Sequence, residues 1–351
     1  MNTQRRVLVL ATLAIMSTVT LAHRLLPVRG IPADEMTAAA ARFVEALSPE
    51  QRTQAVLDFD DTDRGRWHYV PTEMHPRKGL SVQDMGGELR PLAHALLHSG
   101  LGREGYLKAT TIMSLESILH RLQKQGRFTR DPEWYFFSIF GDPATDAKWA
   151  WRVEGHHLSL NFTVENGRVV AATPAFFGAN PARVSDGSSR DGLVTLSLEE
   201  SLARKLYLAL DDTQRTKALI ASEAPADIRV PGGLHPPDSE DSGLVVSEMT
   251  TSQRAVLVSL ITEYAERMPE PVAQQWLDEI KDAGMGKIRF AWAGGDDMGE
   301  PHYYRLEGPT FLIEYANTQN GGDGKPANHI HSVWRSQLND FGLGALSLIH
   351  I

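Results

Sequence analysis

The chain has 351 residues, a net charge of −9, 42% hydrophobic residues and no cysteine. This composition excludes collagen-like, disulfide-scaffold and wholly disordered proteins, and the acidic balance leaves no basic surplus for nucleic acid, so no nucleic-acid partner is expected. Without cysteine there are no disulfides, thiolate metal sites or cysteine nucleophiles, and any chemistry must use His, carboxylates, hydroxyls or a bound ion.

Residues 1–22 have the three parts of a secretory signal peptide. Two arginines precede the apolar run 7–19, and Thr20-Leu21-Ala22 supplies a small-residue cleavage site. We therefore expect an exported protein, periplasmic or secreted. A retained membrane anchor is the alternative, but the thirteen residues of the run fall short of the roughly 20 that a spanning helix needs. Cleavage after Ala22 would leave His23 at the N-terminus, where its amine and side chain could chelate copper.

The next part of the chain predicts a tether and then helices. Residues 23–33 are expected to form the tether, and residues 34–351 a single domain. The clearest helix start is Ser48-Pro49-Glu50-Gln51, which combines an N-cap hydroxyl, a first-turn proline and Gln three residues after the cap. The predicted helices are 34–47 (with Asp34 as N-cap), 48–59, 81–98 and 103–125.

A period of two then replaces the helical pattern. Strands are expected at 134–140, 149–153, 157–164 and 168–174, with Glu165-Asn166-Gly167 as a hairpin turn and a surface loop at 178–191. Helices resume at 197–210, 211–221, 250–267 and 270–283, interrupted by a long surface loop or linker at 224–243. The last strands are expected at 287–293, 302–306, 310–316 and 330–335. The predicted class is α+β, with helices packed against a largely antiparallel sheet.

One segment of the chain recurs. Trp151–Phe162 matches Tyr304–Tyr315 at a constant offset of 153 residues, with Arg-hydrophobe-Glu-Gly followed by alternating apolar residues. The match indicates two copies of a helices-then-hairpin unit, at 34–177 and 195–351. The alternative is that hairpins reuse the same residues. Duplication predicts that both hairpins lie in one sheet, or in two sheets related by an approximate twofold axis.

Two histidine clusters are the strongest chemical signal. On a strand, His329 and His331 point to the same face and can present two imidazoles to one ion. We predict that His157 joins them as a third metal ligand, and that Glu314 converges on the same cleft as a ligand or general base. These ligand types suit zinc, copper, iron or manganese. The alternative is that the histidines are hydrogen-bonded core or rim residues.

Further residues are predicted to contact the substrate or to support the ligands: His68, His156, Asn161, Trp334 and Arg335. Asn161 occupies the position that matches Glu314 in the repeat, and Arg335 could recognise a carboxylate or phosphate. His68 belongs to Arg66-Trp67-His68-Tyr69, which either lines a pocket or is a strand entering the sheet. The sequence contains no phosphate-binding loop, dinucleotide fingerprint, hydrolase elbow or His-Glu-x-x-His motif.

Four of these segments together resemble the family catalogued as domain of unknown function number 3500. They are Arg64–Pro71, Ser99–Tyr106, Trp149–Asn161 and Asn328–Gly342, and the resemblance spans roughly residues 43–348. It implies a shared fold and a set of candidate residues but no activity. Where such proteins often have Trp-Arg-Asp, this chain has Ser336 in place of the acid.

Two functions follow from these observations. The first is an exported, metal-dependent hydrolase or oxidoreductase with a His/Glu site in a sheet cleft. The second is a non-enzymatic exported protein that binds a small ligand with the same residues. Both predict a small-molecule partner and no membrane span after cleavage of the signal.

Overall fold

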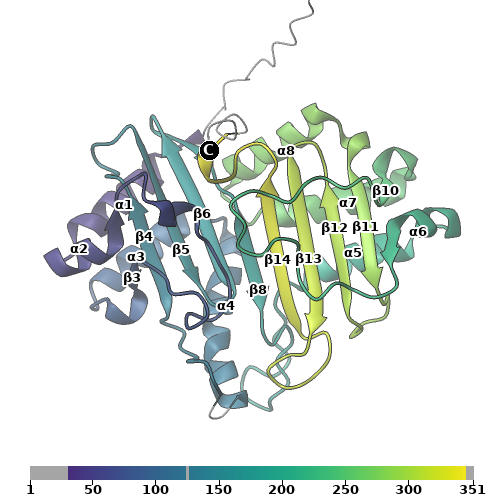
Figure 1. Cartoon of the computed structure of the whole chain (residues 1–351), viewed down its shortest axis with the longest axis horizontal. Coiled ribbons are helices and arrows are strands. Elements are labelled where there is room, and N and C mark those ends of the chain that lie inside the picture. Colours follow the sequence, from purple (N-terminus) through teal and green to yellow (C-terminus); the bar gives the residue numbers. More distant parts are fainter. Residues whose placement is uncertain (1–30, 124–125, 345–351) are drawn as a thin grey trace, which may run out of the picture.

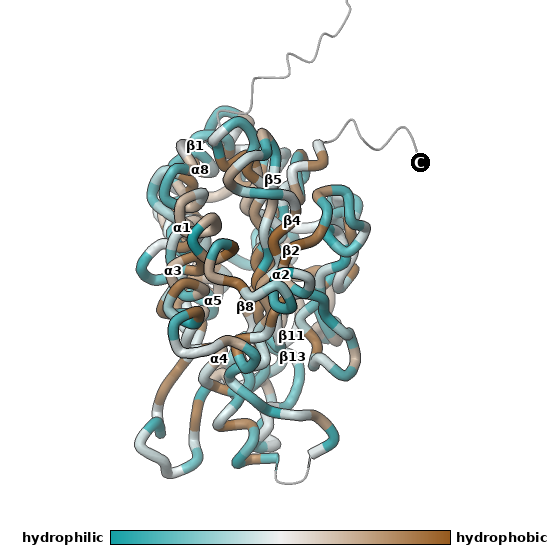
Figure 2. Tube along the Cα trace, turned by 90° about the vertical axis from the view of Figure 1, so that its left-hand side faces the viewer, coloured by the Kyte–Doolittle hydropathy of each residue, from teal (hydrophilic) through white to brown (hydrophobic). Residues whose placement is uncertain are grey.

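The computed structural model describes residues 31–123 and 126–344, so the predicted signal peptide lies outside the described residues. A 14-stranded sheet runs through the described chain, in the order β10-β11-β12-β13-β14-β8-β6-β5-β4-β2 along its main path. The helices cover one face of this sheet and loops cover the other (Figures 1 and 2). The predicted α+β class is therefore confirmed. Among the described residues, no helix combines the length and the apolar character needed to cross a membrane.

The first half of the chain contributes four helices to one face and the left part of the sheet in Figure 1. Residues 31 and 32, expected in the tether, form a short strand that pairs with β7. The elements are β1 (Ile31–Pro32), α1 (Asp34–Glu45), α2 (Pro49–Ala55), β2 (Val56–Leu57), β3 (Leu80–Ser81), α3 (Leu89–Ser99), α4 (Arg103–Leu122), β4 (Tyr135–Phe140), β5 (Lys148–Gly155), β6 (Leu158–Glu165), β7 (Arg168–Ala171) and β8 (Ala175–Ala179).

The second half repeats the order of α1 to β6, and β14 follows as its last strand. Its elements are α5 (Ser197–Leu208), α6 (Asp212–Ala218), β9 (Leu219–Ala221), β10 (Leu244–Val245), α7 (Thr251–Ala265), α8 (Glu270–Gly284), β11 (Arg289–Gly294), β12 (His302–Glu307), β13 (Phe311–Gln319) and β14 (His329–Ser336). The strand pairings recur as well: β2 pairs in parallel with β4, as β9 does with β11, and β3 pairs antiparallel with β4, as β10 does with β11. The predicted offset appears in the register, since Trp151 opposes Phe162 and Tyr304 opposes Tyr315. The halves meet where β8 pairs antiparallel with β14.

Several predicted helix ends are wrong, and strand pairing explains most of them. The capping boxes at Ser48 and Asp211 are present. Both helices nevertheless end early, because the residues that follow pair with β4 and β11 as β2 and β9. Asp34 lies in the first turn of α1 and is not its cap, which falls at Ala33. The helix predicted at 81–98 begins only at Leu89, after a 3-10 turn at Val82–Asp84.

One close contact joins the halves on the helix side of the sheet. The backbone N–H of Gly102 donates to the carbonyl of Arg267, at 2.9 Å. A Cβ atom at Gly105 would lie 1.9 Å from that same carbonyl oxygen. Glycine inside a helix costs about 1 kcal/mol relative to alanine. Its presence in α4 is explained by this approach of α4 to the chain that connects α7 with α8.

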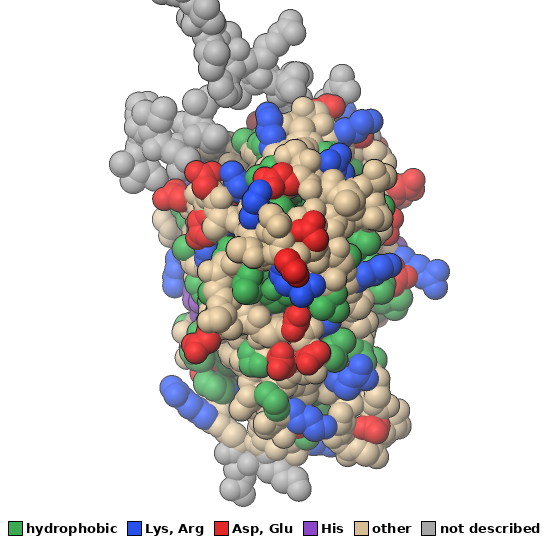
Figure 3. Space-filling model, turned by 90° about the vertical axis from the view of Figure 1, so that its right-hand side faces the viewer, with side chains coloured by type: hydrophobic (Ala, Val, Ile, Leu, Met, Phe, Trp, Pro, Cys, Tyr) green, Lys and Arg blue, Asp and Glu red, His purple; other side chains and the backbone are tan. Residues whose placement is uncertain are grey.

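Two equivalent segments cover the other face of the sheet. We call residues 58–79 the first cover segment and residues 222–243 the second; they connect β2 with β3 and β9 with β10. They enclose a second core that contains Trp67, Tyr69 and Ile228. The predicted surface loop or linker at 224–243 is therefore in part a packed element, since Ile228 is 4% exposed. At the β10 end of the sheet, the surface in Figure 3 carries interspersed acidic and basic side chains, which disfavour pairing with another strand.

Candidate metal centre

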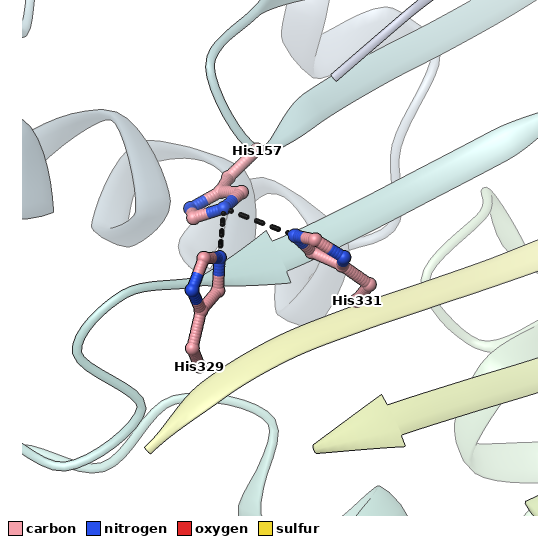
Figure 4. A group of neighbouring side chains, drawn as sticks. All are labelled: His157, His329 and His331. Atoms are coloured by element: carbon pink, nitrogen blue, oxygen red, sulfur yellow. Dashed lines mark hydrogen bonds between the residues drawn. The ribbon is translucent and has the colours of Figure 1, made fainter. Parts of the chain in front are cut away.

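Three histidines meet on the face beneath the cover segments. His157 comes from the turn between β5 and β6, and His329 and His331 come from β14 (Figure 4). The Nε2 atom of His157 lies 2.8 Å from Nε2 of His329 and 3.3 Å from Nε2 of His331. One ligand atom from each of the three rings lies within 4.8 Å of the others. The structure thus brings together the three residues that the sequence proposed as metal ligands.

The pairing of β8 with β14 and β6 brings the turn to the strand. Gly178 of β8 opposes His331, and its N–H donates to the carbonyl of His157 at 2.8 Å. A Cβ atom at Gly178 would lie 3.1 Å from the His157 ring and 2.8 Å from a β14 carbonyl oxygen. The absence of a Cβ atom at Gly178 therefore makes space for the imidazole of His157.

His157 has a backbone conformation that is unusual for histidine. It lies outside β6, in a two-residue turn, with φ of 64°. Left-handed backbone costs a residue with a side chain on the order of 1 kcal/mol, and glycine or asparagine is the usual occupant. A histidine in such a position suggests that its side chain has a function.

The environment favours neutral imidazoles at His157 and His329. His157 is 3% exposed and His331 6% exposed, while His329 is half-buried. Burial, together with the neighbouring histidines, holds the pKa of His157 and of His329 well below the ordinary value. A neutral ring has the free nitrogen lone pair that a metal ion requires.

Asp227 of the second cover segment lies directly behind His331. Its Oδ1 is 2.7 Å from Nδ1 of His331, and its Oδ2 accepts a hydrogen bond from the Tyr69 hydroxyl at 3.1 Å. Burial raises the pKa of Asp227, but the hydrogen bond and charge of His331 outweigh it, and the net pKa is lowered. A carboxylate on the far nitrogen leaves Nε2 free for an ion and is typical of metal-bound histidine. Sequence reasoning missed Asp227, because nothing in its spacing distinguishes it from other acids in this segment.

His156 and His329 also have defined partners. His156 stacks on His157, with ring centroids 3.8 Å apart, and its Nδ1 lies 2.5 Å from a Glu116 carboxylate oxygen. Burial lowers the pKa of His156. The backbone N–H of His329 donates to Oδ1 of Asn317 at 3.1 Å. The stacked ring of His156 therefore supports the His157 ring without belonging to the three-histidine cluster.

Glu314 is not brought into the histidine group. It lies on the same face as His331, because it opposes Val333 of β14 while Ala316 opposes His331. Its Oε1 accepts hydrogen bonds from the Tyr303 hydroxyl at 2.7 Å and from the Arg229 N–H at 3.0 Å. Its Oε2 is buried and has no hydrogen-bond partner among the described residues. The predicted four-residue cluster is thus a cluster of three histidines. The Glu314 carboxylate lies on the neighbouring strand β13, two residues from Ala316, which opposes His331.

The remaining predicted site residues make internal contacts. Trp334 faces the helices and stacks on Trp276 at 4.5 Å. Arg335 donates to Asp340 at 2.5 Å and to a backbone carbonyl of the second cover segment at 3.0 Å, so its guanidinium is already occupied. Asp340 thereby supplies an acid near the position where the chain has Ser336. The Asn161 amide donates to the carbonyl of Pro174 at 2.9 Å, and Nδ1 of His68 accepts from the N–H of Tyr69 at 3.0 Å.

The distances between the three rings are close to those of a site for one metal ion. Zinc binds imidazole nitrogen at 2.0–2.1 Å, so two nitrogens in a tetrahedral site are separated by about 3.4 Å. Nε2 of His157 lies 3.3 Å from Nε2 of His331, which matches this separation, and 2.8 Å from Nε2 of His329, which is about 0.6 Å too short. The ligand atoms of all three rings lie within 4.8 Å of one another, so ring rotations would be needed to bring them to one ion. Three histidines leave a fourth position for water or substrate.

Comparison with known proteins gives a family but no activity. A family model described as "protein of unknown function (DUF3500)" matches residues 29–343, nearly the whole chain. No curated protein and no solved structure matches this sequence.

Proposed function

The chain belongs to the DUF3500 family, whose description assigns no activity, and we propose from the geometry of its site that it binds one divalent transition-metal ion. His157, His329 and His331 would be the ligands. The observation that carries the proposal is the convergence of three Nε2 atoms with a carboxylate behind one of the rings. Zinc, copper, iron and manganese all accept this ligand type.

The charges around the site also support a cation. The partners of Asp227 are His331, the Tyr69 hydroxyl and the backbone N–H of Ile228. No lysine or arginine of the described chain forms an ion pair with Asp227. Asp227 is partly buried, and a carboxylate in such a place whose one charged partner is an imidazole has little compensating positive charge. A divalent ion on the far side of the His331 ring would provide that positive charge.

An ion held by these three histidines would supply metal-assisted hydrolysis of a small molecule. With its fourth position open, it would lower the pKa of its bound water to about 7. Glu314 is the proposed proton acceptor, since it lies on the same face, is held by Tyr303 and Arg229, and has no hydrogen-bond partner at Oε2 within the described part of the chain. We further propose export of the mature protein to the periplasm or medium, on the strength of residues 1–22.

A ligand cleft without metal has less support. That hypothesis needs Asn161, Trp334 and Arg335 to face a small molecule. All three are buried, and each is engaged with another part of the chain.

Elemental analysis after purification without an affinity tag tests the proposal. The wild-type chain is expected to carry, or to take up from zinc, copper or manganese solutions, one ion per chain. His329→Ala combined with His331→Ala should abolish uptake. The matched control is His98→Ala with His120→Ala, which removes two exposed histidines away from the site and should retain the ion. Equal metal content in wild type and in the His329/His331 variant would overturn the proposal.

A further inference from the structure

The geometry points to Tyr69 as a positioning residue for the metal site, through which the first cover segment tunes the affinity for the ion. This inference rests on the proposed metal function. It concerns a residue outside the set of ligands. Tyr69 belongs to the first cover segment, which lies on the face of the sheet opposite the helices. Three independent contacts of Tyr69 support it.

The first contact is made by the backbone. The carbonyl of Tyr69 accepts the N–H of His157 at 2.8 Å. This bond holds the strained turn that presents the His157 ring. Through it, the first cover segment reaches one ligand directly.

The second contact is made by the hydroxyl. Tyr69 donates to Oδ2 of Asp227 at 3.1 Å, while Oδ1 of Asp227 lies 2.7 Å from Nδ1 of His331. Both oxygens of Asp227 are thereby oriented, and the His331 ring is held with Nε2 toward the other histidines. The hydroxyl therefore acts on His331 through Asp227.

The third contact is made by the ring. Tyr69 stacks on Phe176 of β8, with centroids 3.8 Å apart and planes at 4°, and lies against the His331 ring at 4.7 Å. Since Phe176 belongs to the strand at the junction of the halves, the ring is fixed to the sheet independently of the hydroxyl. Removal of the hydroxyl alone should therefore leave the packing in place.

These contacts assemble the site from both halves. Tyr69 and His157 come from the first half, and Asp227, His329 and His331 from the second. A hydrogen bond that fixes a carboxylate behind a ligand histidine contributes to metal affinity, and loss of such outer groups typically weakens binding 10- to 100-fold. Loss of the Tyr69 hydroxyl leaves Asp227 in place, so the effect should be smaller, about 5-fold.

Titration of the full chain with Co²⁺, followed by its visible d–d absorption, tests this inference. Tyr69→Phe is expected to raise the Kd for Co²⁺ about 5-fold and to shift the absorption band. Tyr315→Phe is the matched control, because Tyr315 is equally buried and its hydroxyl also donates to a carboxylate, Glu200, on the helix side of the sheet. The control should bind Co²⁺ like wild type. In an Asp227→Ala background, Tyr69→Phe should have no further effect, since its effect passes through Asp227.

Each outcome separates the two proposals. If wild type fails to bind Co²⁺, the metal function is wrong and the role of Tyr69 with it. If wild type binds and Tyr69→Phe has the same Kd and spectrum as Tyr315→Phe, the metal site stands and the role of Tyr69 is overturned. An equal loss in the presence and absence of Asp227 would also overturn it, because the effect would then be structural.

Discussion

The two halves of the molecule share a scaffold and differ at the turn that closes each hairpin. In the first half, His156 and His157 form the turn between β5 and β6; in the second half, the corresponding turn contains Pro309 and Thr310, which have no group that titrates in the ordinary range. The ligands therefore come from one turn of the first half and one strand of the second, at the junction of β8 and β14. The repeated order of elements accounts for the sheet, whereas the site depends on residues that the two halves do not share.

The buried charges divide in the same way. Arg152 pairs with Asp63 at 2.6 Å and with Glu154 at 3.0 Å, and in the equivalent position Arg305 pairs with Glu240 and Glu307. These pairs recur, so they belong to the scaffold. The cross-strand neighbour of each arginine does not recur, since Asn161 opposes Arg152 and Glu314 opposes Arg305. Ionisable groups that are present in only one half and lie under the cover segments are the candidates for function.

The contact that docks the halves should be the least tolerant of change. In Gly105→Ala the new Cβ would lie 1.9 Å from a backbone oxygen of Arg267, and backbone cannot move aside as a side chain can. We expect a loss of about 3 to 5 kcal/mol in the free energy of unfolding, measured by urea denaturation. Gly286→Ala is the control, because its nearest neighbour would be 3.7 Å away. Similar stability of the two variants would mean that α4 is not pressed against the second half.

Glu199 marks a difference between the equivalent helices α5 and α1, since the third residue of α1 is Met36. Glu199 is fully buried and pairs with Arg267 and Lys108, both at 2.6 Å. Burial raises the pKa of Glu199, but these two cations outweigh it, and the pKa is lowered below 4.5. The folded pKa is thus below the unfolded one, so the stabilisation is complete above about pH 4.5 and is lost as the pH falls through the folded pKa.

Glu199→Gln should therefore cost about 3 kcal/mol near neutral pH, because it leaves buried cations without their anion. The difference from wild type should shrink in acid, where wild-type Glu199 becomes protonated. Denaturation at a series of pH values measures this. A difference that stays constant down to pH 3 would contradict the assignment.

The capping boxes at Ser48 and Asp211 should contribute equally to stability, because they occupy equivalent positions in the two halves. The N–H of Gln51 donates to Ser48 at 3.2 Å, and that of Gln214 donates to Asp211 at 2.8 Å. Ser48→Ala and Asp211→Ala should each reduce the free energy of unfolding by about 1 kcal/mol. Denaturant midpoints of the two variants are the readout. Costs that differ by more than about 1 kcal/mol would show that α2 and α6 are not energetically equivalent.

The smallest change in the free energy of unfolding is expected for a variant that removes a metal ligand. His157→Gly removes a ligand and relieves left-handed backbone, so the metal-free variant should be as stable as wild type or up to about 1 kcal/mol more stable. Unfolding in the presence of a chelator measures this, and metal uptake is measured in parallel. Asn166→Gly relieves a φ of 51° in the β6–β7 turn and should retain the ion. Marked destabilisation by His157→Gly would indicate that the ring is a packing residue.

Local rules predicted the parts of this structure that depend on neighbouring residues. The cap at Ser48, the turn at Asn166-Gly167 and the parity of His329 and His331 are of this kind. The strand β8 was missed, because its pairing with β6 and β14 depends on segments far away in the sequence.

The same limit applies to the site. The three ligands could be named from their spacing and the repeat, since a strand fixes which side chains share a face. Asp227 could not, because its role depends on how the second cover segment folds back over the sheet. Glu314 was placed on the correct face, but its partner Arg229 lies in that same segment, so the engagement of its carboxylate was not predictable.

The most direct test of the account is X-ray absorption at the zinc edge on the zinc-loaded full chain. Three imidazole nitrogens at about 2.0–2.1 Å and one oxygen in the fourth position are expected, and the imidazole signal should disappear in the His329→Ala, His331→Ala variant. A zinc environment with fewer than two histidines, or one that is unchanged in the variant, would contradict the assignment of the three-histidine site.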